Sequence, residues 1–198
     1  MAKRNEPEVG TPDLVLLSLL AEHPMHGYQA NAELERRQVR DWVAISRPQI
    51  YYSLEKLARL ELISESRDPG EPGGPERRVY RTTAKGKSAL SRALADPQWT
   101  KTRDRPRFLT WLALSWQADQ AVVKQQIQRR REFLEKQLER EQHVLEAVRE
   151  EVGHDFHEAV WMLTLTLEQF RTELGWLDRL ERELPRRAPA RHPDLVRG

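Results

Sequence analysis

The stretch from Arg107 to Leu184 contains no proline, and this feature constrains the fold more than any other in the sequence. Proline interrupts helix interiors, so its absence here, together with the helical spacing of the apolar residues, predicts long helices. Gly153 divides the stretch, since glycine commonly follows the last turn of a helix. We therefore predict one helix over about 119–152 and a second from about 156 onward, which together form an antiparallel helical arm.

The second helix of the arm carries an apolar heptad seam, in which the steps between residues alternate between 4 and 3. The seam consists of Phe156, Val160, Leu163, Leu167, Phe170, Leu174 and Leu177. Such a seam packs against another helix, and we predict dimerisation through it, with the same helix of a second chain as one partner. Further apolar residues widen this surface, so the helix is expected to contact more than one neighbour. They are Trp161, Leu165, Trp176 and Leu180.

The first helix of the arm has the residue spacing of a nearly straight helix. Its apolar positions are Val123, Ile127, Leu134, Leu138 and Leu145. A shorter helix over 106–118 is apolar nearly all round, and we expect it to be buried between the arm and the N-terminal part of the chain.

Unlike the C-terminal part, for which long helices are predicted, the N-terminal part of the sequence begins with three short helical patterns. They cover residues 11–23, with Thr11 as the expected N-cap, a segment from 25 or 26 to 37, and a segment that begins at the N-cap Ser46. The third helix has one apolar stripe, which should be buried. The stripe consists of Ile50, Leu54, Leu57 and Leu60.

Two β-type runs, 62–67 and 78–82, flank a segment rich in proline and glycine, and a helix over 83–95 is expected to follow. We expect this helix to point Ala84, Leu90 and Leu94 inward. Three helices, a hairpin and a further helix are the plan of a winged helix-turn-helix. We therefore predict a mainly α fold with a small β-hairpin, composed of an N-terminal winged helix-turn-helix and the C-terminal antiparallel helical arm.

Near Asp96 the short helical and β-type patterns give way to long helical periodicity, and this change predicts the domain boundaries. A winged helix-turn-helix domain is expected over residues 11–96 and a helical dimerisation domain over 97–184. Residues 1–10 and the basic tail at 185–198 lack apolar periodicity, so we predict that both are disordered.

The charge is nearly balanced, with 33 basic and 31 acidic residues and a net charge of +2. A polyanionic partner must therefore be met by a local patch. One such patch runs from Arg77 to Arg92, where six residues are basic and none is acidic. It covers the second strand of the hairpin and the helix that follows.

Several classes of protein lack support in the sequence. There is no cysteine, and no apolar run approaches the roughly 18 residues of a membrane span, so we expect a cytoplasmic protein without membrane contact. A glycine-rich phosphate loop, an H-E-x-x-H motif and a nucleophile elbow are all missing, so we predict neither an enzyme nor a cofactor. His154 and His157 are spaced i, i+3, yet polar residues of this kind more commonly begin a helix, and no metal is predicted.

Three blocks stand in order along the chain, at Leu19–Tyr28, Ser46–Leu57 and Arg78–Gly86. The first ends in a Gly-Tyr pair, the second contains Tyr51, and the third leads from the second wing strand into the next helix. Together they resemble the PadR family of bacterial transcriptional regulators. The helical C-terminal part is also similar to that of longer members of this family.

The sequence departs from the family pattern at three positions. Pro48 and Glu61 stand where glycine is common, and Thr82 stands where an aliphatic residue is common. Pro48 suits the first turn of a helix, although it can re-aim the neighbouring side chains. Glu61 lies at a turn that can require positive φ, which costs a side chain on the order of 1 kcal/mol.

The resemblance implies a sequence-specific transcriptional regulator, and we expect a homodimeric repressor that a small-molecule effector releases. Two winged domains held at a fixed separation would address a palindromic operator in double-stranded DNA. The alternative is an arm-linked dimer, in which the winged domain binds protein and not DNA.

The predicted DNA-binding residues are Ser46, Arg47, Gln49, Tyr51, Tyr52, Lys56, Arg59, Arg77, Arg78 and Arg81. Arg47 and Gln49 are expected to contact base edges, because arginine pairs with guanine and glutamine with adenine in bidentate fashion. The remaining basic residues are expected to hold phosphates. Tyr51 can serve either as a phosphate contact or as a core residue.

The six tryptophans raise the question of an effector pocket. Relatives are implied to respond to small aromatic or cationic compounds near the domain junction or the dimer interface. Core packing is the commoner role for any one tryptophan. Trp99 and Trp111 are the candidates for a pocket.

Overall fold

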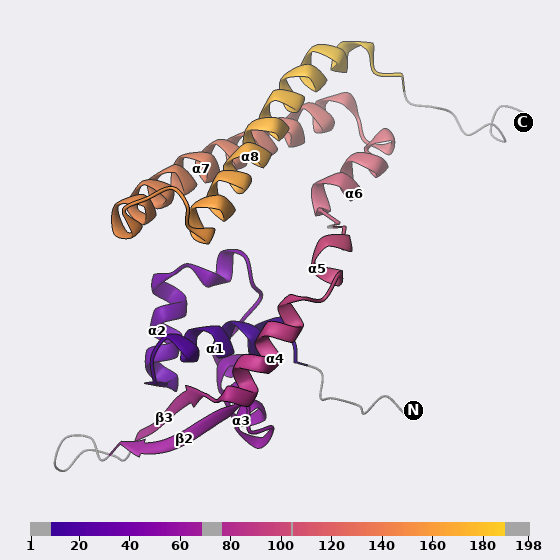
Figure 1. Ribbon diagram of the computed structural model, residues 1–198. Coiled ribbons are helices and arrows are strands. Elements are labelled where there is room, and N and C mark those ends of the chain that lie inside the picture. The colour runs from indigo at the N-terminus through magenta and orange to yellow at the C-terminus, as the bar shows by residue number, and fades with distance from the viewer. Residues whose placement is uncertain (1–8, 69–76, 104, 189–198) are drawn as a thin grey trace, which may run out of the picture. The chain divides into compact units, whose positions relative to one another are not determined.

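The computed structural model describes residues 9–68, 77–103 and 105–188 (Figure 1). The fold is mainly helical with one small antiparallel sheet, as the sequence predicts. The chain divides into two compact units, residues 1–103 and 104–198. This division falls later in the chain than the boundary between residues 96 and 97, which was expected from the change in sequence pattern.

The N-terminal unit has the element order of a winged helix-turn-helix. Its elements are α1 (Thr11–Glu22), β1 (Met25–His26), α2 (Gly27–Arg36), η1 (Val39–Asp41), α3 (Arg47–Arg59), β2 (Ile63–Asp68), β3 (Arg77–Thr82), α4 (Ala84–Leu94) and α5 (Gln98–Lys101). The N-cap of α1 is Gly10, whose N–H donates to the carboxylate of Asp13, and not Thr11 as predicted. Ser46 caps α3 as predicted, since its Oγ accepts a hydrogen bond from the Gln49 N–H at 3.3 Å.

The sheet has the strand order β1-β3-β2, and β2 and β3 form the hairpin that we call the wing. β1 was not predicted, because its two residues were assigned to the start of the second helix. The chain leaves α1 through His23 in an extended conformation and passes Pro24, which carries Met25 alongside Tyr80 of β3. The buried Met25 side chain adds to the core from this strand.

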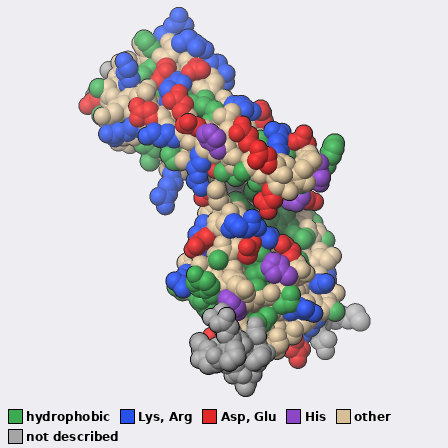
Figure 2. All heavy atoms as spheres, turned by 90° about the vertical axis from the view of Figure 1, so that its left-hand side faces the viewer, with side chains coloured by type: hydrophobic (Ala, Val, Ile, Leu, Met, Phe, Trp, Pro, Cys, Tyr) green, Lys and Arg blue, Asp and Glu red, His purple; other side chains and the backbone are tan. Residues whose placement is uncertain are grey.

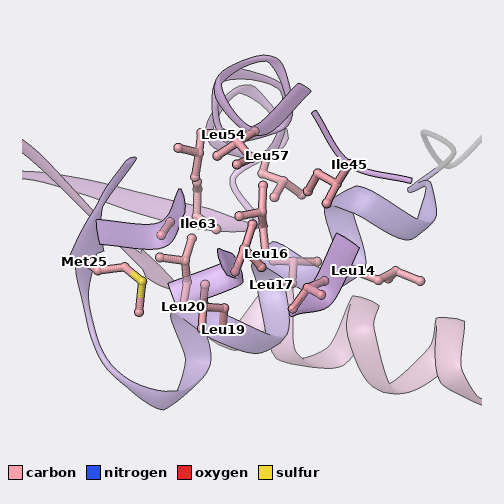
Figure 3. Packing of buried hydrophobic residues seen from close by; sticks show 14 of the residues in the cluster. Leu14, Leu16, Leu17, Leu19, Leu20, Met25, Ile45, Leu54, Leu57 and Ile63 are labelled. Carbon is pink, nitrogen blue, oxygen red and sulfur yellow. The ribbon is translucent and has the colours of Figure 1, made fainter. Parts of the chain in front are cut away.

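The core of the N-terminal unit forms around α1. This helix contacts α3, α4 and β3, and its buried leucines point to more than one side of the helix (Figure 3). They are Leu14, Leu16, Leu17, Leu19 and Leu20. Ile50, Leu54 and Leu57 complete the contact from α3, as the predicted stripe requires, whereas Leu60 is half-buried at the end of that helix.

Helix α4 confirms the inward position predicted for Leu90 but not those predicted for Ala84 and Leu94. Gly86, Ala89, Leu90 and Ala93 face inward, whereas Leu94 is 61% exposed and Ala84 is also exposed. The four inward residues recur at steps of 3, 1 and 3, so they share one narrow face of the helix. Residues 84 and 94 lie off that face.

The base of the wing is closed by hydrogen bonds of the Thr83 hydroxyl to backbone groups and by the close approach of Gly86 to the backbone. Thr83 caps α4 by accepting from the Gly86 N–H at 3.0 Å, and its hydroxyl donates to the carbonyl of Glu61 at 2.9 Å. A Cβ on Gly86 would lie 2.0 Å from the carbonyl oxygen of Leu62, so only glycine fits there. Glu61 has a φ of 59°, the left-handed conformation considered for this turn.

Thr82, the third departure from the family pattern, is buried. Its hydroxyl donates to the carbonyl of Leu17 in the middle of α1 at 2.7 Å. The buried hydroxyl therefore has a hydrogen-bond partner. An aliphatic side chain at this position would make apolar contacts but no hydrogen bond.

The C-terminal unit consists of α6 (Arg107–Leu114), η2 (Ser115–Gln117), α7 (Gln120–Val152), α8 (Glu158–Glu183) and η3 (Leu184–Arg186). Helix α7 ends at Gly153, which has a φ of 78°, and α8 returns along it to form the predicted arm. Two apolar clusters hold α7 and α8 together, as do the ion pairs of Arg130 with Glu173 and of Arg131 with both Asp178 and Glu181.

Most of the predicted heptad seam packs within the chain. Val160, Leu163, Leu167 and Leu177 are buried against α7, and Phe170 and Leu174 are half-buried in the same contact. Phe156 precedes α8 and is 81% exposed. The helix that satisfies this seam in the structure is therefore α7 of the same chain.

Helix α6 differs from its prediction because none of its residues is buried. Phe108 and Trp111 pack on the apolar cluster of the arm, but Leu109 and Leu114 are 48% and 58% exposed. A helix that is apolar all round cannot bury every side against one flat neighbour.

We expect Gly86→Ala to destabilise the N-terminal unit by about 2 kcal/mol, because the new methyl group meets a backbone carbonyl that cannot move without opening the wing. Urea denaturation followed by circular dichroism measures this free energy. Ser88→Ala, at an exposed position of the same helix, is the control and should change stability little. A Gly86→Ala protein as stable as the wild type would contradict the close contact.

We expect Glu61→Gly to raise the free energy of unfolding by about 0.5–1 kcal/mol, because glycine adopts the left-handed conformation without steric cost. The lost ion pair with Lys85 is exposed and contributes little. Glu61→Ala removes the same ion pair but keeps the strained conformation, so it should not be stabilising. The same denaturation experiment separates the two variants.

Candidate nucleic-acid interface

Helix α3 presents one polar face to solvent. Arg47, Tyr52 and Arg59 are exposed, and Ser46 is exposed at the cap. Gln49 is half-buried, and its amide donates to the hydroxyl of Ser53 at 3.4 Å. Ser53 itself is fully buried. The start of α3 therefore exposes the guanidinium of Arg47, with the half-buried amide of Gln49 beside it.

The hydrogen bonds of Arg40 fix the turn before α3. Its guanidinium donates to the carbonyl of Ile45 at 3.1 Å, to Glu35 at 2.9 Å and to the buried Asn31 at 2.8 Å. The hydrogen bond from Arg40 lowers the pKa of Glu35. Because Ile45 directly precedes the cap residue, this network sets where α3 begins.

Tyrosines extend the exposed surface from α3 to the start of α2. Tyr51 is 42% exposed, and a Cβ on Gly27 would lie 2.9 Å from its ring, so glycine allows the ring to lie against the α2 backbone. Tyr28, which follows Gly27 in the sequence, is 65% exposed. Tyr28 is absent from the DNA-binding residues predicted from the sequence, although the Gly-Tyr pair at the end of the block Leu19–Tyr28 was a signal for it.

The wing contributes basic side chains. The Arg78 side chain is 69% exposed and its Nε lies 3.2 Å from Glu65 on the neighbouring strand. Arg81 is also exposed, and it pairs in register with Ser64. Arg77 lies at the start of β3, but its side chain and the wing tip at residues 69–76 are outside the described part of the structure.

Ion pairs divide the basic residues into two groups. Among the described residues, Arg47, Arg59 and Arg81 have no acidic partner within 4.0 Å, so their charge is available to an anion. Lys85 pairs with Glu61, and Lys56 pairs with Asp13 at 2.7 Å. Lys56 therefore differs from the other predicted phosphate ligands, because its ammonium points into the fold.

The two tryptophans predicted to line a pocket belong to different units. The Trp99 indole N–H donates to the carbonyl of Ala93 at 2.8 Å and holds α5 to the end of α4. Trp111 stacks on Phe108 with ring centroids 5.4 Å apart. Each of them thus has a packing role in its own unit.

A shallow groove of about 530 Å³ lies on the side of α8 that carries Leu165 and Trp176. Its remaining lining residues are Glu168, Gln169, Thr172, Glu173 and Arg179. In Figure 2, acidic and basic side chains intermingle over the C-terminal unit, in the upper part of the view.

Two negative findings concern the described residues alone. None of their helices combines the length and apolar character of a membrane span. Within the same ranges, histidines and carboxylates do not gather into a group of three suited to a metal ion. His157 instead caps α8 by accepting from the Ala159 N–H at 3.1 Å.

Three helices, a three-stranded sheet with a β-hairpin wing and an exposed basic face define the class of winged helix-turn-helix proteins. Residues 16–92 match the sequence profile of the transcriptional regulator PadR-like family, so the N-terminal unit contains a domain of that family. The resemblance seen in the sequence is thus confirmed. Members of this family are transcriptional regulators and not enzymes.

Solved structures share the fold along nearly the whole chain. Bacillus subtilis PadR in complex with operator DNA is 18% identical, with a TM-score of 0.77 over 90% of this chain and 99% of that chain. The PadR-like regulator BC1756 from Bacillus cereus is 20% identical, with a TM-score of 0.68 over 88% and 98%. Bacillus subtilis PadR in complex with p-coumaric acid is 17% identical, with a TM-score of 0.73 over 87% and 98%. A search of curated proteins finds no match.

Proposed function

We propose that the protein is a homodimeric repressor that binds a palindromic operator through α3 and the wing. One observation carries this proposal: the start of α3 exposes Arg47 next to the half-buried Gln49, while the adjacent wing exposes Arg78 and Arg81. A helix with an exposed polar start fits the major groove, and basic residues beside it fit the flanking phosphates. The operator complex of Bacillus subtilis PadR, which has this fold, supports the proposal.

The two groups of side chains have different roles in this proposal. Arg47 and Gln49 read base edges, because both offer bidentate hydrogen bonding. Tyr51 and Tyr52, which are 42% and 58% exposed, act as donors to phosphate oxygens. Arg59, Arg77, Arg78 and Arg81 neutralise phosphates.

The dimer contact is proposed on the outer side of α8, because the predicted seam already packs on α7. Trp161 and Leu165 are 55% and 61% exposed, although large apolar side chains one turn apart are rarely left in water. They continue into the groove that contains Trp176. The same face of a second chain, related by a two-fold axis, would cover this stripe.

Release of the operator is proposed to follow binding of a small molecule to the helical unit. Bacillus subtilis PadR has been solved with p-coumaric acid, an aromatic carboxylate, which supports this class of ligand. Trp111 belongs to the helical unit and remains a candidate lining residue, whereas Trp99 belongs to the N-terminal unit, on α5.

We expect Arg47→Ala to relax discrimination at one base position of the operator by about 1–3 kcal/mol, because it removes a bidentate contact. Arg78→Ala is the matched comparison, and it should weaken binding to all duplexes alike and lower the slope of log K against log salt by about one. Fluorescence anisotropy with a duplex selected from a random library, and with single-base variants of it, measures both effects.

The same experiment tests the proposed function itself. If the wild-type protein enriches no sequence from the library and shifts no duplex at low salt, the winged unit does not bind DNA. Unchanged discrimination in Arg47→Ala would instead contradict only the role of that side chain.

We expect Leu165→Asp to convert the dimer into a monomer, because a charge would enter the centre of the proposed apolar contact. Sedimentation velocity measures the change. Val122→Asp replaces an exposed apolar residue of α7 and is the control that should leave the dimer intact. A dimer that survives Leu165→Asp would place the contact elsewhere.

A further inference from the structure

Lys56 of α3 has its ammonium against α1. Its Nζ lies 2.7 Å from Oδ2 of Asp13, and the two residues are 43 positions apart in the sequence. The Asp13 side chain is 4% exposed and that of Lys56 is 21% exposed. The other basic residue in the second half of α3, Arg59, is exposed and has no acidic partner within 4.0 Å among the described residues.

The pair is held from both sides. The same oxygen of Asp13 accepts a hydrogen bond from the Gly10 N–H at 2.8 Å, at the N-terminus of α1. A buried carboxylate is strongly destabilising unless charges and hydrogen bonds compensate it, and these two donors provide the compensation. Rotation of α3 about its axis, or sliding along α1, would leave the carboxylate without its ammonium.

Helix α3 is therefore fixed by polar contacts near both ends. At its start, Arg40 holds the carbonyl of Ile45, one residue before the cap. In its third turn, Lys56 holds Asp13. Ile50 and Leu54, which lie between these contacts, supply burial but tolerate small rotations, whereas a charged hydrogen bond is directional.

We infer that Lys56 is a positioning residue for the reading helix, which acts through Asp13 and does not bind a phosphate. This inference rests on the proposed function, in which α3 reads the operator. It replaces the role predicted for Lys56 from its sequence position. Lys56 then determines how Arg47 and Gln49, on the same rigid helix, approach the bases.

A double-mutant cycle between positions 13 and 56 tests the inference. The variants are Lys56→Met, Asp13→Asn and the double variant, because asparagine keeps an oxygen for the Gly10 N–H while it removes the buried charge. Arg59→Met removes the same charge from the same helix and is the matched control. Each protein is titrated, at temperatures where circular dichroism shows it folded, with the selected duplex and with a scrambled duplex at several salt concentrations.

We expect Lys56→Met to lower the ratio of the affinity for the selected duplex to that for the scrambled duplex about tenfold. The slope of log K against log salt should stay unchanged. In the Asp13→Asn background the same substitution should change the ratio less than twofold, because the interaction is already lost. Arg59→Met should lower the slope by about one and leave the ratio unchanged. Loss of about one unit of slope on Lys56→Met in both backgrounds would overturn the inference, because Lys56 would then contact a phosphate.

A measurement without DNA keeps the inference separate from the proposed function. In ¹H–¹⁵N correlation spectra, Lys56→Met should shift the amide of Gln49, almost two turns away at the capped start of α3, as well as that of Gly10. Shifts confined to residues beside Lys56 would show that the pair does not set the orientation of α3, and would overturn the inference. If α3 reorients but the wild-type protein selects no duplex, the proposed function fails and the positioning role stands.

Discussion

Burial of α1 is the constraint on which the N-terminal unit depends. Its leucines face α3 on one side and α4 and β3 on others, so the positions of the reading helix and of the wing are both defined relative to this one helix. A helix that is apolar on nearly every side is stable only when it is surrounded. The polar contacts of Asp13 and Thr82 then select one arrangement among those that the apolar packing allows.

Much of the fold could be predicted, because its signals are local. The cap at Ser46, the stripe on α3 and the glycine after α7 each depend on neighbouring residues. β1 escaped prediction because two residues carry no periodicity, and it exists only through its pairing with β3. Gln38, with a φ of 51°, was also unforeseen, because glutamine is not a residue that marks a left-handed turn.

The site was harder to predict than the fold. A heptad pattern shows that a helix face is covered, but it does not reveal whether the covering helix belongs to the same chain, and here α7 covers it. The charge of Lys56 likewise does not reveal a partner on α1. Exposed residues such as Arg47 and Arg81 were found correctly on the surface, since their sequence neighbours already account for the buried face.

Thr82 has a consequence for how the sheet can evolve. Apolar contacts between a strand and a helix permit small slips, because one methyl group can replace another. The hydroxyl of Thr82 needs one particular partner. A slip of β3 along α1 would separate it from the Leu17 carbonyl and leave it buried without a hydrogen bond. Insertions or deletions in the wing are therefore confined to its far end, and the strand next to α1 keeps a single alignment.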